Sequence, residues 1–415
     1  MDIKKSEFKK IITSSVIIFL FVIFNLFNLF IIYENLDLKD DFKVTQDIVK
    51  RYGYKIDDNM VKNFKKYYND EIKKMNEITE KSTGKKYKSA LELANDLKGG
   101  GHSYTKENID FFNKVSTEEY YYESMKNVDN EYNKMNVMDI AEMEIKKYKL
   151  QEKAAETVRG EYRDFNKRFK AIVQNKEYKN IFFIGKHSLL FKMIFKSFIY
   201  EIIILSVLIM GYLINYEFDN NTYLLTYSTK RGRRLVWDKL QVAIFTNLIL
   251  STAIIGFGLL AYFIAFDYSG LWHVPISNYF NREQGFTSMC WYNLSFIQYM
   301  VATIFIIYMC NLLFNGIAFF ISMYVKNSYI VFFIFVVFFG ISILGIPGIS
   351  LDSNMIFILG FNPFMLVMNT KVWLMEAGAF FTFKYYELIT IGVWGGILIV
   401  LSLLSFNRFK KRDIN

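Results

Sequence analysis

Hydrophobic and polar positions divide the chain into two regions of opposite character. Residues 34 to 186 are crowded with Lys, Glu, Asp, Asn and Tyr, whereas residues 187 to 407 hold most of the Ile, Leu and Phe in apolar stretches of transmembrane length. A further apolar segment, residues 11 to 33, precedes the charged region. This pattern predicts an integral membrane protein whose charged domain is inserted after the first membrane helix.

The first apolar segment has a length that suits a bilayer core of about 30 Å. It is too long for an ordinary signal-peptide core, and no A-x-A cleavage pattern follows it, so we predict an uncleaved signal anchor. Four lysines lie before it, within residues 1 to 10. The positive-inside rule therefore places residues 1 to 10 in the cytoplasm and residues 34 to 186 outside the cell.

Five more spans are predicted in the second region, which makes six in all. If the first span runs outward, three connections become cytoplasmic, and each carries Lys or Arg: the loop 216 to 239, the turn 326 to 328 and the tail 408 to 415. We expect a multi-pass protein of the cell membrane with both termini in the cytoplasm. The five spans are predicted near residues 189 to 215, 240 to 266, 296 to 325, 329 to 346 and 388 to 406.

The charged domain is predicted to be mainly helical, because it has few turn signals and no sustained alternation of period two. Near its end, apolar residues recur in helical steps and define a stripe on one long helix, which we expect to continue into the second span. Such a stripe is more often a packing face than a partner site. The fold class is therefore all-α: six transmembrane helices and a helical extracytoplasmic domain. The stripe comprises Ile145, Tyr148, Ala155, Val158, Tyr162, Phe165, Phe169 and Ile172.

The net charge of +10 does not alter the prediction of a membrane protein, because many basic residues flank apolar segments. We expect membrane lipid as a partner and no nucleic acid. The only cysteines are Cys290 and Cys310, and Cys310 lies inside an apolar run, so neither a disulfide framework nor a CxxC metal site is predicted.

Catalytic signatures are missing from the sequence. No nucleotide-binding loop occurs, since Gly84-Lys85-Lys86 lacks the upstream glycine and the following hydroxyl. The histidines His102, His187 and His273 lack metal-ligand spacing, and neither G-x-S-x-G nor HExxH is found. We predict no catalytic residue, metal or cofactor on this chain, and an energy source on another chain.

The loop between the second and third predicted spans has a distinctive order of residues. An acidic residue ends the second span, a short apolar segment follows a threonine, and a basic cluster precedes a lysine that opens the third span. This order resembles the type-2 ABC exporter permeases, in which a Gly-Thr pair, a short helix, a Ser/Pro turn and a basic cluster stand between the same acidic residue and lysine. The matching positions are Glu217, Thr222, Leu224, Leu225, Ser228, Arg231, Arg233, Arg234 and Lys239.

Two positions depart from the family pattern. Asn221 stands where the family usually has Gly, and the Pro after the apolar helix is missing. Asn tolerates the left-handed conformation better than most residues, so we expect the turn to survive. The resemblance covers the six-span plan but is sharp over about 24 residues only.

The loop suits a coupling role, because a short amphipathic helix can seat Tyr223, Leu224 and Tyr227 in a groove of a soluble partner. The resemblance implies that this partner is a cytoplasmic ABC ATPase subunit, which holds ATP and Mg. It also implies a second permease, identical or homologous, in a unit of two permeases and two ATPases. A simpler interpretation is that the arginines of the loop only anchor it to lipid phosphates, and both interpretations can hold together.

Two further features concern the membrane region. Residues 347 to 384 contain an apolar stretch broken by Gly360 and by Asn362-Pro363, which resembles the short re-entrant helices of the family; the alternative is a surface loop with an interfacial helix. Glu201 lies inside the second span, where a carboxylate is costly, so it is a candidate for the substrate path. Alternatively, Glu201 is solvated near the outer interface.

The first expectation for function is a permease subunit of an ATP-driven exporter. It would couple hydrolysis by the separate ATPase to outward transport of a peptide, antibiotic, lipid-like or ionic substrate, and it would not itself be an enzyme. The alternative is a membrane receptor or scaffold that senses an extracellular ligand without transport. A lipid-modifying enzyme is disfavoured, because no nucleophile, metal cluster or paired acid is recognisable.

Overall fold

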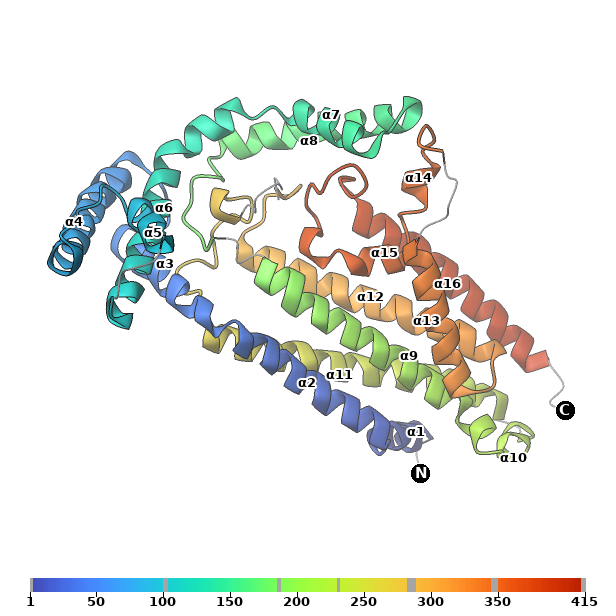
Figure 1. Ribbon diagram of the computed structural model, residues 1–415. Helices are drawn as coiled ribbons and strands as arrows, with labels where there is room; N and C mark the ends of the chain where they lie inside the picture. Colours follow the sequence, from blue (N-terminus) through green and yellow to red (C-terminus); the bar gives the residue numbers. More distant parts are fainter. Residues whose placement is uncertain are drawn as a thin grey trace.

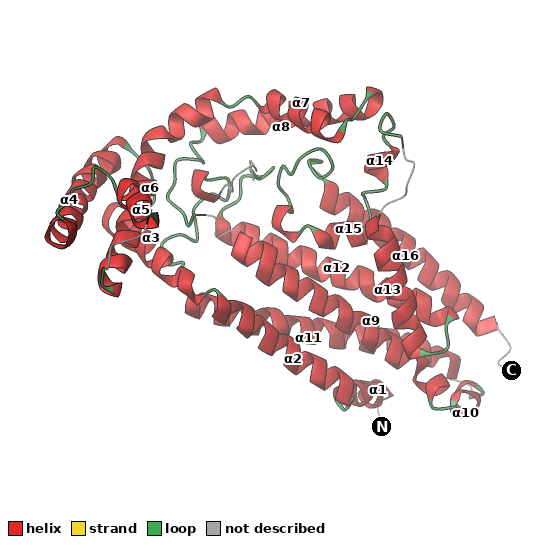
Figure 2. Cartoon of the chain, viewed as in Figure 1, coloured by secondary structure: helices red, strands yellow, loops and turns green. Residues whose placement is uncertain are grey.

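The computed structural model describes residues 3–99, 104–184, 188–229, 232–281, 289–344 and 350–411. Within these ranges the chain is all-helical, with no strand beyond three isolated bridges (Figure 2). The predicted helical fold class is confirmed at this level.

Five helices are long and apolar enough to cross a membrane, which fits a multi-pass membrane protein. A further apolar helix, α13 (Ser328–Leu344), has 17 residues and a length of about 26 Å, somewhat short of a bilayer core. The five long helices are α2 (Ser15–Glu34), α9 (Phe195–Asp219) with the π-helical turn Ser188–Ile194 before it, α11 (Leu235–Ala265), α12 (Phe296–Tyr324) and α16 (Tyr386–Lys411).

Helix α9 is the centre of the bundle. It packs against α11, α12, α13 and α2, and most of its side chains are buried (Figure 1). By contrast, α2, α11, α13 and α16 leave broad apolar faces exposed, which is how helices in contact with lipid are expected to look.

The amino-terminal segment is not simply a polar extension of the first span. Residues Ile3–Ile12 form a separate helix, α1, which packs on α11 and α9, and Thr13 and Ser14 separate it from α2. In Figure 1 the amino terminus, the short helix α10 (Tyr223–Tyr227) and the carboxy-terminal end of α16 lie at the same end of the bundle. Three of the segments predicted to share one side of the membrane therefore lie at one end of the structure: the amino terminus, the loop that contains α10, and the end of α16.

The charged region forms helices at the opposite end. α3 to α6 form one group, and α7 and α8 run side by side over the ends of the membrane helices (Figure 1). The bounds are α3 (Lys39–Tyr52), α4 (Asp58–Thr83), α5 (Ala90–Lys98), α6 (Lys106–Lys134), α7 (Val137–Tyr148) and α8 (Glu152–Gln174).

The prediction of one long helix through residues 145 to 172, continuing into the second span, is wrong. Lys149 adopts the left-handed conformation with φ of 54°, the chain reverses between α7 and α8, and α8 ends at Gln174. The Leu150 N–H bonds to the carbonyl of Ile145 at 3.0 Å, as in a Schellman-type helix end. The stripe is nevertheless a packing face, since all its members except Tyr148 are buried in one apolar cluster that α6, α7 and α8 share with Trp291.

The outer segment predicted at 347 to 384 contains two short helices rather than a span, and residues 347 to 349 lie outside the described ranges. These helices are α14 (Met355–Ile358) and α15 (Pro363–Met368). The Asn362 side chain caps α15 by accepting from the Met365 N–H at 2.9 Å. α15 packs among α9, α12, α13 and α16, whereas α14 packs below α7 and α8 through Phe357. The re-entrant interpretation stays a prediction.

Candidate coupling site

The turn that follows α9 has the geometry expected from the sequence. Asn221 adopts φ of 54°, so the residue that replaces the usual glycine does enter the left-handed region, as predicted. The Thr222 N–H then bonds to the Glu217 carbonyl at 2.8 Å, and the Thr226 N–H bonds to the Thr222 carbonyl at 3.1 Å. The chain thus reverses sharply and begins α10.

Helix α10 has an outward and an inward face. Leu224 and Leu225 are 54% and 77% exposed, whereas Tyr227 is only 3% exposed. Tyr223 stacks on Phe218 with ring centroids 5.1 Å apart. Tyr227, predicted to contact a partner, instead holds α10 against the bundle, so the exposed apolar surface consists of the two leucines.

The basic segment after α10 passes directly beneath it. A Cβ atom on Gly232 would lie 2.1 Å from the Thr226 carbonyl oxygen, a clash with backbone that only glycine avoids. Arg233 donates to the carbonyl of Lys410 at the end of α16, while Arg234 is exposed. Arg231 lies outside the described residues, so the predicted arginine cluster is represented by Arg233 and Arg234.

Glu217 and Lys239 form a buried ion pair. Lys239 is fully buried, and its ammonium donates to the Glu217 carboxylate and, at 2.6 Å, to the Leu213 carbonyl. The pair joins the end of α9 to the beginning of α11. The two ends of the predicted motif, 22 residues apart in the chain, thus meet in space.

Helix α1 completes this charge cluster, which we define as Glu7, Lys10, Glu217 and Lys239. Lys10 lies 2.7 Å from Glu7 and 3.2 Å from Glu217, so two cations face two carboxylates. Although burial alone would lower it, the pKa of Lys10 is raised above its ordinary value by Glu7 and Glu217, and the ammonium stays charged at neutral pH. Sequence reasoning gave Lys10 a topological role only. The Glu7-to-Lys10 spacing of three residues was a signal for the local pair.

Three more contacts join the turn before α13 to this end of the bundle. Ser328 donates its hydroxyl to Asp219 and also bonds to the Gly211 carbonyl at 3.2 Å. The Lys326 ammonium lies 5.0 Å from the centre of the Phe218 ring. Within the described residues, α1, the loop that contains α10 and the turn before α13 therefore all contact the end of α9 or of α16.

Glu201 lies inside the bundle rather than at a wetted interface. It is 4% exposed and accepts hydrogen bonds from the Asn28 amide at 2.7 Å and the Ser197 hydroxyl at 2.8 Å. Asn28 belongs to α2, so this contact ties the first membrane helix to α9. The alternative that Glu201 is solvated near the outer interface is wrong, and its place on a substrate path stays a prediction.

A second polar layer, which the sequence analysis missed, joins α9, α11 and α12. At its centre, the Asn311 side chain accepts from the Ser206 hydroxyl at 2.7 Å and donates to the Ser251 hydroxyl at 2.9 Å. The Asn315 amide donates to Asn311 at 2.6 Å and accepts from the Asn247 amide at 2.5 Å. All five are at most 2% exposed. Interhelical bonds of this kind hold membrane helices together where the hydrophobic effect cannot. The available signal was the four-residue spacing of Asn247 with Ser251 and of Asn311 with Asn315.

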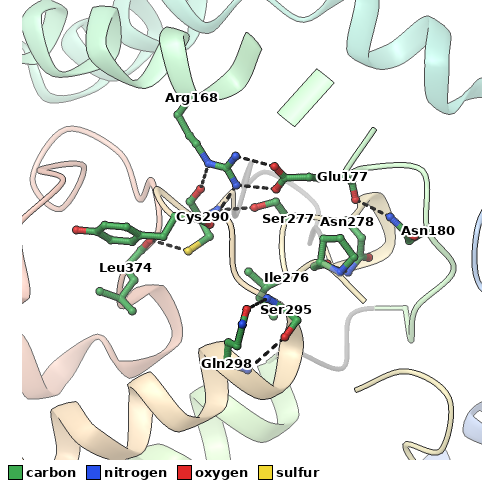
Figure 3. A network of polar contacts seen from close by, with 12 residues as sticks. Arg168, Glu177, Asn180, Ile276, Ser277, Asn278, Cys290, Ser295, Gln298 and Leu374 are labelled. Carbon is green, nitrogen blue, oxygen red and sulfur yellow. Dashed lines mark hydrogen bonds and ion pairs between the residues drawn. The ribbon is translucent and has the colours of Figure 1, made fainter. Parts of the chain in front are cut away.

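At the opposite end, one largely buried ion pair fastens the charged helices to the loop that precedes α12 (Figure 3). Arg168 of α8 contacts both oxygens of Glu177, at 2.7 and 2.6 Å, and donates to the carbonyls of Cys290 and Tyr292, each at 3.0 Å. Ser277 accepts from the Cys290 N–H at 3.0 Å. Burial raises the pKa of the Cys290 thiol to about 12, so it stays protonated.

Within the described residues, no group of three His, Cys, Asp or Glu side chains could hold a metal ion; His102 and His187 lie outside those ranges. Cys290 and Cys310 are both free and buried. Comparisons of the chain with protein-family models, with curated proteins and with solved structures find no match.

Proposed function

We propose that this chain is the membrane subunit of an ATP-driven exporter, and that α10 transmits the movement of a separate ATPase to the membrane helices. The observation that carries the proposal is the outward pair Leu224 and Leu225 on a helix whose inner face is held by the bundle. An exposed apolar pair at the polar end of a membrane bundle fits a groove on a soluble partner.

The support beneath α10 favours a mechanical role. A push on α10 reaches α9 through the turn at Asn221, and it reaches α11 through the ion pair between Glu217 and Lys239. Because α9 is the central helix and shares the polar layers with α2, α11 and α12, movement at its end is transmitted into the bundle. The ATPase subunit would bind ATP and Mg.

The orientation that suits this function places α1, α10 and the end of α16 in the cytoplasm. Lysine and arginine residues at these segments agree with the positive-inside rule. The helices α3 to α8 would then face the outside and cover the exit, and α13 would serve as a sixth, short span. The working unit would hold two permeases and two ATPases, and the substrate would be a peptide, antibiotic, lipid-like molecule or ion.

The test is the double substitution Leu224→Asp with Leu225→Asp. We expect the variant to insert and melt like the wild type, because neither side chain is buried. The wild type should co-purify from native membranes with a P-loop ATPase in about equimolar amount, and the variant should lose this ATPase. Leu91→Asp is the matched control, since Leu91 is 61% exposed on α5 at the opposite end.

Normal ATPase association in the double variant would contradict the coupling role of α10. Absence of a stoichiometric ATPase from wild-type preparations would instead favour a receptor or scaffold, which needs none.

A further inference from the structure

A cavity of about 640 Å³ lies between α8 and the beginning of α16, at the end of the bundle opposite to the termini. This volume falls in the range of about 300–1,000 Å³ that is usual for small-molecule sites. Its lining combines charged and aromatic side chains, among them Glu161, Arg168, Trp291, Phe361, Lys384 and Tyr385.

Most charges at this cavity already have partners, but two opposite charges do not. Arg168 is held by Glu177, and Asp164 pairs with Lys167 at 2.6 Å. Among the described residues, neither Glu161 nor Lys384 has an ion-pair partner within 4.0 Å. Glu161 accepts from the backbone N–H of Lys384, and the Lys384 ammonium attracts Asp164 from beyond ion-pair distance. A carboxylate and an ammonium-bearing residue therefore stand side by side on the cavity wall.

The aromatic wall holds the cation of Lys384 in place. The ring of Trp291 forms part of this wall and is 5% exposed, with its indole nitrogen buried beneath the cavity surface. The ring of Tyr385 lies 5.2 Å from the Lys384 ammonium and holds it near the cavity.

The cavity also reaches an apolar face of a membrane helix. Ile389 of α16 lines it and is 46% exposed, and Leu388 and Val393 expose 52% and 54% on the same helix. Trp, Tyr and Lys together at the end of a membrane helix mark the level of the lipid headgroups. An occupant that meets both surfaces must have a charged end and an apolar end.

We propose that this cavity binds the headgroup of a zwitterionic phospholipid. The ammonium group lies against Glu161, the phosphate accepts from Lys384, and the acyl chains follow the apolar face of α16. Burial raises the pKa of Glu161, which is in no ion pair among the described residues, and a bound ammonium would reverse this shift. The inference goes beyond the proposed function and does not depend on it, because it involves neither α10 nor an ATPase.

The test measures lipid retention by the full-length protein. The protein is reconstituted in vesicles of equal parts phosphatidylethanolamine and phosphatidylglycerol, extracted mildly, and examined by native mass spectrometry. The wild type should retain phosphatidylethanolamine about tenfold better than phosphatidylglycerol, the discrimination expected from one charge-assisted contact.

Two variants with matched controls locate the site. Glu161→Gln should bring the ratio of the two lipids close to one, and Lys384→Gln should lower retention of both lipids about tenfold. Glu156→Gln and Lys170→Gln change exposed charges of α8 outside the cavity lining and should leave retention unchanged.

Unchanged lipid selectivity in Glu161→Gln would overturn the proposal, provided that the variant melts at the wild-type temperature. Competition by glycerophosphoethanolamine, which has no acyl chains, distinguishes a water-soluble zwitterion from a lipid. Displacement of the lipid at equal concentration would overturn the lipid assignment, whereas no displacement supports it.

Discussion

Removing the charge of Glu217 and removing the charge of Lys239 should destabilise the protein by different amounts, and the difference can be measured. Within the described residues, Glu217 is the only carboxylate in ion-pair contact with Lys239, which is fully buried. Glu217, by contrast, has Lys10 at 3.2 Å as a second cation. Glu217→Gln should therefore destabilise the protein more than Lys239→Met.

The magnitudes follow from the cost of leaving one buried charge unpaired, which is about 3–5 kcal/mol. Glu217→Gln leaves the buried Lys239 ammonium with neutral acceptors, such as the Leu213 carbonyl, and without its ion-pair carboxylate, so its loss falls at the upper end of this range. Lys239→Met leaves Glu217 with Lys10 and falls at or below the lower end, at about 3 kcal/mol. In the double variant both buried charges are gone and the Glu7–Lys10 pair remains, so Lys239→Met should restore part of the stability that Glu217→Gln loses.

The assay is equilibrium unfolding of the reconstituted protein, with Lys5→Met as the control for an exposed charge on α1. Equal losses in the two single variants would refute the asymmetry. A double variant whose loss equals the sum of the single losses would refute the pairing itself.

Three further predictions concern other parts of the chain. Gly232→Ala puts a Cβ 2.1 Å from the Thr226 carbonyl and should displace α10, so ATPase co-purification should fall, whereas Gly256→Ala, with open space around it, should leave association unchanged. Asn311→Leu removes the centre of the second polar layer and should cost about 1–3 kcal/mol in unfolding experiments; an unchanged melting temperature would contradict the role of that layer. Burial raises the pKa of Glu118 in α6, so the folded state binds its proton more tightly than the unfolded state. The contribution of Glu118 to stability is therefore fully present below the unfolded pKa of about 4.3 and is lost as pH rises through the folded pKa. Glu118→Gln should weaken the gain in stability on acidification from neutral pH towards the unfolded pKa, and a profile identical to that of the wild type would sink this assignment.

The membrane helices could be predicted from the sequence because length and apolar character are local properties. The predicted first span at 11 to 33 corresponds to α2 (Ser15–Glu34). The ends of the other long spans lie within a few residues of their predicted positions, except at the amino end of α11 and the carboxy end of α16. The separation of α1 was not foreseen, because Ile11 and Ile12 extend the apolar run across the break at Thr13.

The prediction of one long helix through residues 145 to 172 was wrong for a specific reason. Its stripe skips from Tyr148 to Ala155, seven residues, which is close to two helical turns, so the apolar period continues across a chain reversal. The turn depends on Lys149, which adopts a left-handed conformation. Glycine is the usual sequence signal for that conformation, and this position has none.

The candidate site was predicted in outline only. The motif identified Glu217, Lys239 and the leucines, but the partners Glu7 and Lys10 lie more than 200 residues before Glu217 and only the tertiary fold brings them there. Likewise, the role of the Arg168–Glu177 pair depends on its contact with the loop at Cys290, and the position of that loop cannot be predicted from hydrophobic periodicity.

The central claim is that α10 docks an ATPase, and site-specific photo-crosslinking in native membranes tests it most directly. A photoreactive amino acid at position 225 replaces a side chain that is 77% exposed, and one at position 227 replaces a side chain that is 3% exposed on the same helix. The account predicts an adduct with a P-loop ATPase from position 225 and none from position 227. An ATPase adduct missing from position 225, while lipid adducts form there, would contradict it.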